Sequence, residues 1–301
     1  MRIDIIAGAR PNFMKIGPII KQITMFNATH PDTSFQYRLI HTGQHYDRNM
    51  SDSFFEQLGI PEPDINLGAG SGTQASQTAQ IMIGYETAIQ EWKPDICIVV
   101  GDVNSTMACS IVAKKAGIKV AHVEAGIRSG DWSMPEEINR IVTDSITDYF
   151  FTTSEEANSN LKQAGHAENK IYYVGNTMID SLLDNLGKLK KPDFFDSSFA
   201  GEKYIVLTLH RPSNVDDPAK LAVLLDRIHD AVNDCKVLFP MHPRTRKIYT
   251  AIGKDYPQFV IVEPMSYLEF MYAIKNAAGV VTDSGGITEE TTVLNIPCIT
   301  L

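Results

Sequence analysis

Cysteine is scarce in this 301-residue chain and follows none of the spacings typical of metal or redox sites. The four cysteines form no Cys-x-x-Cys pair and stand at Cys97, Cys109, Cys235 and Cys298. Cys97 and Cys298 lie in apolar runs of the kind that form strands. We expect all four to be reduced core residues, as in proteins of the reducing cytoplasm.

Basic residues do not outnumber acidic ones in this chain. Lys and Arg number 27 against 36 Asp and Glu, which gives a formal net charge of -9 at pH 7. An acidic chain of this kind lacks the basic surface that nucleic acids and anionic membranes bind, so neither is an expected partner. A small anion remains compatible with this charge, because salt screens charges beyond roughly 8 Å and nearby donors then dominate.

Long apolar runs are absent as well. No stretch approaches the roughly 20 apolar residues of a membrane-spanning helix, and Arg10 interrupts the N-terminal run too early for a secretory signal. We therefore expect a cytoplasmic protein. The 44% hydrophobic and 21% charged residues are typical of a folded globular chain, and the length allows two domains.

Short apolar runs bounded by Gly or Asp alternate with amphipathic stretches along the chain, which is typical of strands buried on both faces. This order predicts an α/β fold with two Rossmann-like, doubly wound parallel-sheet domains. A polar connector after Gly175 predicts the division into residues 1–175 and a nucleotide-binding domain of residues 176–301. Leu301 directly follows a predicted strand, so we expect the second domain to be truncated.

In open α/β sheets, ligands bind at the carboxyl ends of the strands. The polar groups and turns that follow predicted strands are Gly8-Ala9-Arg10, Gly101-Asp102, His122, Glu124, His210-Arg211, His242 and Asp283-Ser284. A carboxylate at the end of a buried strand must be solvated, paired or functional. Asp102 and Glu124 are therefore candidates for a functional or a structural role.

Two predicted strand-to-helix turns are suited to anions. The "GARP" turn carries Arg10, with Lys15 about one helical turn further on; its alternative interpretation is a plain turn with a surface arginine. In "DSGG", free backbone N–H groups and the helix dipole suit a phosphate, while Glu289 and Glu290 complement the dipole or accept sugar hydroxyls. The alternative there is an ordinary Asp or Ser N-cap.

Glu136 has a competing structural interpretation. Ser133 and Glu136 have the spacing of a capping box, which favours a role at a helix start. The apolar residues that follow predict a buried stripe and are Ile138, Ile141, Val142 and Ile146.

Signatures of metals and dinucleotides are missing. His41 and His45 have no accompanying Cys/His cluster, and the glycine-rich segment 68–72 lacks the GxGxxG pattern after a strand. No metal and no cofactor are expected.

Seven segments together resemble the non-hydrolysing UDP-N-acetylglucosamine 2-epimerases. In order along the chain they are "GARPNFMK", "GQHYDRNM", "VVGDVNST", "AHVEAGIRS", "MPEEINR", "TLHRPSN" and "TDSGGITEE", which span Gly8 to Glu290. The resemblance implies a glycosyltransferase-B-like fold with two domains facing a cleft, usually as a homodimer. It implies the reversible conversion of UDP-N-acetylglucosamine into UDP-N-acetylmannosamine, a precursor of surface polysaccharide.

The resemblance also assigns roles to residues. The acid/base carboxylates would be Asp102, Glu124 and Glu136, with His210 near the sugar and diphosphate. The diphosphate region would be held by Arg10, Lys15, Ser284, Gly285 and Gly286. Glu290 would bind the ribose, and Phe270 would contact the uracil, although its spacing also fits a helix core residue.

The expected chemistry explains this set. The C2 proton of the sugar is only weakly acidic, because C2 has no adjacent carbonyl. A general base accelerates a reaction by about 10²- to 10⁴-fold, which is insufficient here. Departure of UDP from C1 would acidify that proton, and UDP would add back after protonation on the opposite face. Electrostatic stabilisation of the leaving UDP is then the main requirement.

Some bacterial members of the family have a second, allosteric UDP-sugar site, and this chain departs from them there. Asp47 and Ser71-Gly72 stand where some bacterial members have Gln and Arg-Gln, although Gln44, Arg211 and His242 remain. Alternative functions are an epimerase for another UDP-sugar such as a diacetamido uronic acid, a hydrolysing epimerase, a glycosyltransferase of the same fold, and a UDP-sugar-binding remnant without turnover.

Overall fold

The computed structural model describes residues 1–43, 55, 58–199, 201–232 and 235–301. The chain divides into two compact units, Met1–Ser181 and Leu182–Leu301. The expected division lay at Gly175; the helix that follows it, α7 (Thr177–Asn185), spans the observed boundary. No helix among these residues is long and apolar enough to cross a membrane.

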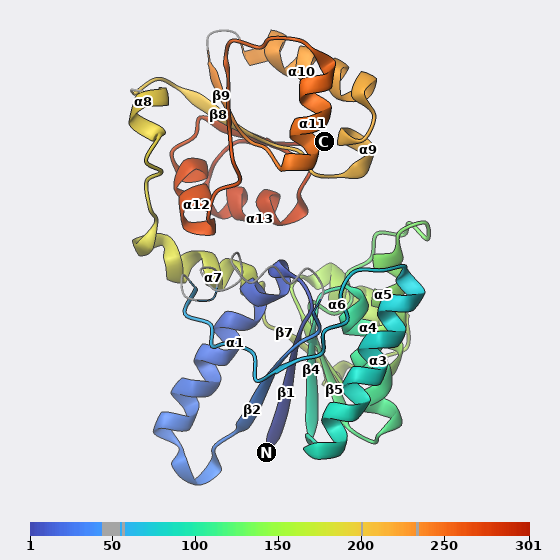
Figure 1. Ribbon diagram of the computed structural model, residues 1–301. Coiled ribbons are helices and arrows are strands. Elements are labelled where there is room, and N and C mark those ends of the chain that lie inside the picture. Colours follow the sequence, from blue (N-terminus) through green and yellow to red (C-terminus); the bar gives the residue numbers. More distant parts are fainter. Residues whose placement is uncertain (44–54, 56–57, 200, 233–234) are drawn as a thin grey trace. The chain divides into compact units, whose positions relative to one another are not determined.

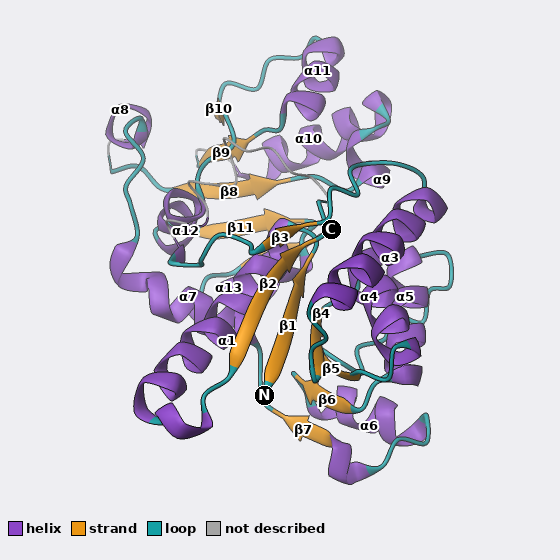
Figure 2. Ribbon diagram, turned by 60° about the horizontal axis from the view of Figure 1, so that its bottom comes forward, coloured by secondary structure: helices purple, strands orange, loops and turns teal. Residues whose placement is uncertain are grey.

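The first unit is a seven-stranded parallel sheet with the order β3-β2-β1-β4-β5-β6-β7. Figure 1 labels β1, β2, β4, β5 and β7 of this sheet. Its strands are β1 (Arg2–Ala7), β2 (Gln36–His41), β3 (Ile65–Asn66), β4 (Ile96–Val100), β5 (Lys119–Val123), β6 (Tyr149–Thr152) and β7 (Ile171–Tyr173). Its helices before α7 are α1 (Arg10–Thr29), η1 (Pro31–Thr33), α3 (Gln74–Glu91), α4 (Asn104–Lys115), α5 (Pro135–Ile146), α6 (Glu155–Gln163) and η2 (Glu168–Lys170). Helices α3, α4 and α5 pack side by side, away from α1 (Figure 2).

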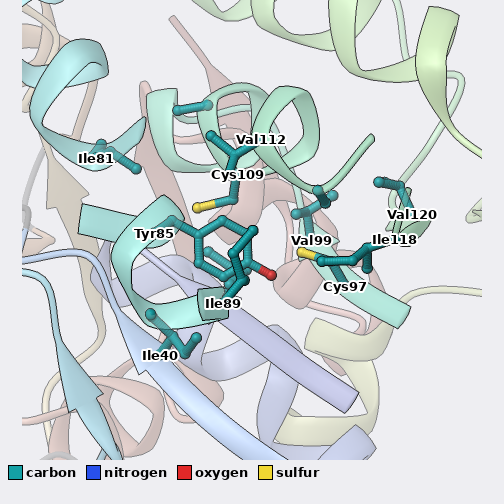
Figure 3. Packing of buried hydrophobic residues seen from close by; sticks show 14 of the residues in the cluster. Ile40, Ile81, Tyr85, Ile89, Cys97, Val99, Cys109, Val112, Ile118 and Val120 are labelled. Atoms are coloured by element: carbon teal, nitrogen blue, oxygen red, sulfur yellow. The ribbon is translucent and has the colours of Figure 1, made fainter. Parts of the chain in front are cut away.

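The core of this unit shows why the apolar runs become strands and helix faces. Tyr85 of α3 is fully buried, and its ring lies among Cys109 of α4, Ile40 of β2 and Ile89 of its own helix (Figure 3). Burying each such side chain contributes about 1.5–3 kcal/mol. The hydroxyl of Tyr85 donates to the buried Asp4 carboxylate at 3.2 Å, so its polar end is satisfied.

The second unit is a five-stranded parallel sheet with the order β10-β9-β8-β11-β12. Its strands are β8 (Tyr204–Thr208), β9 (Lys236–Pro240), β10 (Phe259–Val262), β11 (Gly279–Thr282) and β12 (Cys298–Thr300). Its helices are η3 (Leu186–Lys188), α8 (Phe195–Phe199), α9 (Pro212–Val215), α10 (Pro218–Val232), α11 (Pro243–Ile252), α12 (Tyr267–Lys275) and α13 (Gly285–Leu294). Separate apolar clusters lie under α10 and α11 and under α12.

The expected α/β class is confirmed, because every strand pairing in both sheets is parallel. Each sheet reverses its winding at one switch point, between β1 and β4 in the first unit and between β8 and β11 in the second. Ligands of such sheets bind outside the carboxyl ends of the strands at these points. The cysteines are all free thiols; Cys97 and Cys109 are fully buried, and Cys235 and Cys298 are half-buried.

Candidate active site

The switch point of the first sheet is formed by two turns that touch. A Cβ atom on Gly8, after β1, would lie 2.1 Å from the Ser105 hydroxyl of α4, so only glycine fits there. Asn12 secures the same turn, because its Oδ1 accepts from the Ala9 N–H at 2.9 Å and its Nδ2 donates to the Val100 carbonyl at 3.1 Å. Gly8 is thus required by close packing against α4 and need not be explained by a ligand.

Lys15 and Glu124 form an ion pair at this switch point. The Lys15 ammonium donates to Glu124 Oε2, and the two side chains are only 13% and 10% exposed. Glu124 has a φ of 68°, in the left-handed region that costs a non-glycine residue about 1–2 kcal/mol. Backbone strain of this kind persists where the surrounding structure enforces it, often at functional sites. A Cβ on Gly101 would lie 3.3 Å from Glu124 Oε2 and 3.4 Å from Lys15 Nζ, so the β4 turn faces the same pair.

Asp102 follows Gly101 and is held by Arg140 of α5. The Arg140 guanidinium donates through Nη2 to Asp102 Oδ2 and through Nη1 to Glu137 Oε2, the latter at 3.1 Å. The Asn139 amide donates to the Asp102 carbonyl at 2.8 Å. One helix therefore fixes both the backbone and the carboxylate of Asp102, whose side chain stays 29% exposed.

A buried polar network lies beneath this turn. His122 is fully buried, with Nδ1 at 2.7 Å from Asp144 Oδ1 and Nε2 at 2.8 Å from the Gly101 carbonyl. Burial raises the pKa of Asp144, but His122 and Arg128 outweigh burial and hold that pKa below its usual value. His122 thus supports the β4 turn from inside and does not present its ring to a ligand.

The capping-box interpretation of Glu136 is wrong. Helix α5 begins at Pro135, its N-cap residue is Met134, and no side chain caps it. Ser133 instead donates to Asp131, while Ile138 is 43% exposed, so the predicted stripe is not fully buried.

The neighbouring carboxylate, Glu137, has the structural role at this end of α5. It accepts from the N–H groups of Ser129 at 2.9 Å and Gly130 at 3.1 Å. Burial raises the pKa of Glu137, but these donors and Arg140 lower it below its usual value. Glu136 is half-buried in the first turn, and none of the described residues pairs with its side chain. It is therefore available for another role.

Some predicted residues lie outside the described part of the chain. These are Gln44, His45 and Asp47, together with the side chain of Arg10, whose backbone begins α1. Ser71 and Gly72 are described and lie exposed before α3. His41 is buried, which lowers the pKa of its ring to about 4, and its Nδ1 accepts from the Gly43 N–H at 2.7 Å.

The second unit places Ser284, Gly285 and Gly286 at the carboxyl end of β11. Ser284 is the N-cap residue of α13, but its side chain makes no capping hydrogen bond. The helix begins at Gly285, so the glycines form its first turn and the N–H groups there have no intrahelical partner. This geometry suits an anion, as expected from "DSGG".

Asp283 joins this helix start to His210, which follows β8. Its buried carboxylate accepts from the ring Nδ1 of His210 at 2.5 Å. It also accepts from the backbone N–H groups of His210 and Arg211 and from the Asn214 amide. His210 itself is exposed. The structure thus brings together the two strand ends of this switch point.

Glu290 lies in the second turn of α13, which corrects the expectation that Glu289 and Glu290 begin the helix and complement its dipole. The expectation fails because Gly285 and Gly286 form the first turn of the helix. Glu290 is 3% exposed and accepts from the Tyr267 hydroxyl at 3.0 Å. Burial raises the pKa of Glu290 to about 7, although the Tyr267 hydrogen bond opposes this shift.

Phe270 of α12 is half-buried and packs against the apolar cluster of the second unit. Of the two interpretations of Phe270, uracil contact and helix core residue, the structure shows the second. Sequence reasoning names Asp283 as the end of a buried strand but misses its hydrogen bond with His210. It also misses Arg140 and Tyr267, which carry no distinguishing pattern.

Two doubly wound sheets in succession, each with polar groups at its switch point, place the chain among the glycosyltransferase-B-like α/β proteins. The chain belongs to the UDP-N-acetylglucosamine 2-epimerase family, whose model matches residues 27–301. The family-level resemblance of the seven segments is thereby confirmed.

Relatives and solved structures agree with this assignment. The chain is 42% identical to the UDP-N-acetylglucosamine 2-epimerase of Methanocaldococcus jannaschii, over all of this chain and 83% of that protein. It is 38% identical to the UDP-2,3-diacetamido-2,3-dideoxy-D-glucuronate 2-epimerase of Pseudomonas aeruginosa, again over 100% of this chain and 83% of the relative. The M. jannaschii enzyme in complex with UDP-GlcNAc and UDP superposes with a TM-score of 0.87, at 42% identity, over 100% of this chain and 84% of the other.

Proposed function

We propose that this protein interconverts UDP-N-acetylglucosamine and UDP-N-acetylmannosamine by eliminating and re-adding UDP. The observation that carries the proposal is 42% identity to a UDP-N-acetylglucosamine 2-epimerase over all of this chain and 83% of that protein. The product would serve surface-polysaccharide synthesis.

In the second unit we propose the groups that bind the nucleotide. The N–H groups at Ser284, Gly285 and Gly286 hold the diphosphate, because a helix N-terminus favours negative charge. Glu290 accepts the ribose hydroxyls, and the half-buried ring of Phe270 contacts the uracil. These donors stabilise the charge that grows on UDP as the C1–O bond breaks.

In the first unit we propose the groups that act on the sugar. Asp102, Glu124 and Glu136 act as the acid/base carboxylates at C2, and His210 of the second unit acts near the sugar and diphosphate. Arg10 and Lys15 add positive charge near the diphosphate. The ion pairs of Asp102 with Arg140 and of Glu124 with Lys15 support these roles, because each holds a carboxylate in one position.

A second candidate is the 2-epimerisation of a UDP-diacetamido uronic acid, supported by the 38% identical P. aeruginosa relative. Incubation with a panel of UDP-sugars, followed by chromatography of the products, separates the two. We expect a mixture of UDP-N-acetylglucosamine and UDP-N-acetylmannosamine. Turnover of the uronic acid alone would favour the second candidate, and release of free N-acetylmannosamine would indicate a hydrolysing enzyme. Turnover only with an acceptor would indicate a glycosyltransferase.

We also propose a homodimer. Large apolar side chains are exposed on α3 and near the start of α5, at Ile83, Trp132 and Ile138, and these helices flank α4. Light scattering after size-exclusion chromatography should give twice the chain mass. Trp132→Ser should weaken the dimer, and a monomer at micromolar concentration would contradict the proposal.

A cytoplasmic location is proposed for the same enzyme. Its support is the free thiol state of the cysteines, which a reducing compartment maintains. Cell fractionation should recover the protein with cytoplasmic markers, and recovery with the envelope would contradict the proposal.

A further inference from the structure

Asp283 is a fully buried carboxylate at the point where β11 passes into α13. Burying a carboxylate is costly unless hydrogen bonds compensate. Here the compensation is extensive, because Asp283 Oδ2 accepts from the His210 N–H at 3.0 Å, the Arg211 N–H at 2.9 Å and the Asn214 amide at 3.0 Å. These donors all belong to the turn after β8 and to α9.

The remaining contact of Asp283 differs in kind. His210 Nδ1 lies 2.5 Å from Asp283 Oδ1, while the His210 side chain is 64% exposed. Burial raises the pKa of Asp283, but its hydrogen bonds, led by that from His210, outweigh burial and hold the pKa far below its usual value. Asp283 is therefore ionised and acts only as an acceptor, so Nδ1 must carry the proton of this hydrogen bond.

We propose that Asp283 is a positioning residue that fixes the tautomer and orientation of His210, so that Nε2 is the ring atom presented to the UDP-sugar. This proposal rests on the proposed function, in which His210 acts near the sugar and diphosphate. A carboxylate that holds Nδ1–H leaves the lone pair of the neutral ring on Nε2, the arrangement known from Asp–His pairs in hydrolases.

Asp283 also links His210 to the start of α13. Asp283 directly precedes Ser284, the N-cap of α13, so a single residue connects the anion-binding helix start with the histidine. The strands that carry them, β8 and β11, are paired neighbours in the sheet. Asp283 thus keeps His210 and the N–H groups of α13 in a fixed relation to one another.

A purely structural role for Asp283 makes a different prediction. In that case the backbone and Asn214 contacts would hold the turn after β8, and loss of Asp283 would change kcat equally with and without His210. The dependence of the Asp283 effect on His210 therefore separates the two roles.

The first test needs no turnover. Nitrogen-15 NMR of histidine-labelled protein, recorded at a pH where the ring is neutral, reports the protonated nitrogen of each of the eight histidines. The His210 signal is identified by its loss in His210→Asn. We expect protonated Nδ1 and unprotonated Nε2. An Nε2–H tautomer or a mixture of tautomers would overturn the proposal, even if the chain proved to act on another substrate.

The second test is a double-mutant cycle on the epimerase reaction. Asp283→Asn should lower kcat by on the order of 10²-fold or more with a smaller change in KM, because the ring loses its fixed tautomer. In the His210→Asn background the same substitution should change kcat by less than about threefold. Equal losses in both backgrounds would overturn the proposal.

Matched controls complete the design. Asp230→Asn removes an exposed carboxylate of α10 and should leave kcat unchanged. Circular dichroism verifies that Asp283→Asn is folded; should it not fold, the NMR measurement on the unaltered chain decides. Absence of any epimerase activity in the unaltered chain would contradict the proposed function and leave the tautomer test in force.

Discussion

The ammonium group of Lys15 donates a hydrogen bond to the carboxylate of Glu124, 109 positions further along the chain. The pair connects the first turns of α1 to the end of β5 at the switch point of the first sheet. Both side chains are almost buried, so removal of either partner leaves a poorly solvated charge. The proposed chemistry depends on this arrangement.

Lys15→Met should lower kcat/KM by on the order of 10²-fold, because the Glu124 carboxylate loses its partner and the departing UDP loses a cation. Steady-state kinetics with UDP-N-acetylglucosamine measures the loss. Lys115→Met, which removes an exposed lysine at the end of α4, is the matched control and should retain full activity. Equal activity of the two variants would argue against a role for Lys15.

Two substitutions of Glu124 should differ in stability. Both remove the carboxylate, but Glu124→Gly relieves the left-handed backbone at φ 68° whereas Glu124→Ala retains the strain. Glycine should therefore have a free energy of unfolding about 1 kcal/mol higher than alanine. Urea denaturation of the two variants measures the difference. An alanine variant as stable as the glycine variant would show that the backbone is unstrained.

Arg140→Lys should lower kcat by roughly tenfold. A lysine ammonium cannot reproduce the planar fork that donates to both Asp102 and Glu137, so the Asp102 carboxylate becomes mobile. The thermal midpoint should change less than the activity, because Asn139 still holds the Asp102 backbone. Arg227→Lys, on the exposed face of α10, is the control. Unchanged kcat in Arg140→Lys would show that activity does not depend on the contact of Arg140 with Asp102.

Glu290 should make stability depend on pH. Burial raises its pKa to about 7 from the ordinary 4.5, so between these values the unfolded chain releases a proton that the folded chain keeps. The unfolding free energy contributed by this group therefore falls as pH rises from about 4.5 to about 7, by up to about 3 kcal/mol.

Glu290→Gln removes this titration and keeps an acceptor for Tyr267. It should match the unaltered protein near pH 4.5 and exceed its stability near pH 8, as measured by urea denaturation at both values. Asp255→Asn, an exposed acid in the same unit, should show no such pH-dependent gain. A constant difference across pH would mean that Glu290 titrates normally.

The sequence predicts the strand ends well because a parallel strand buried on both faces must be apolar, and the Gly or Asp that ends it marks the ligand-binding edge. Asp102, His210 and Ser284 were found in this way and follow β4, β8 and β11. The contacts between distant residues, such as Arg140 with Asp102, depend on the packing of helices and leave no local pattern.

The local pattern before α5 led to a wrong prediction, because the spacing of a capping box occurs there without its hydrogen bonds. Ser133 and Glu136 match a capping box, yet Ser133 bonds to Asp131, and α5 begins only at Pro135. Glu137, one residue further, takes the structural contacts. Spacing alone cannot distinguish the two glutamates, because the choice depends on the path of the preceding loop.

The central claim is that electrostatic stabilisation makes UDP a leaving group, so that the C2 stereocentre can be inverted. Incubation with UDP-N-acetylglucosamine in heavy water without added NAD, with C2 followed by NMR, tests it most directly. The account predicts UDP-N-acetylmannosamine that carries solvent deuterium at C2. Product that retains its original C2 hydrogen, or no product at all, would contradict it.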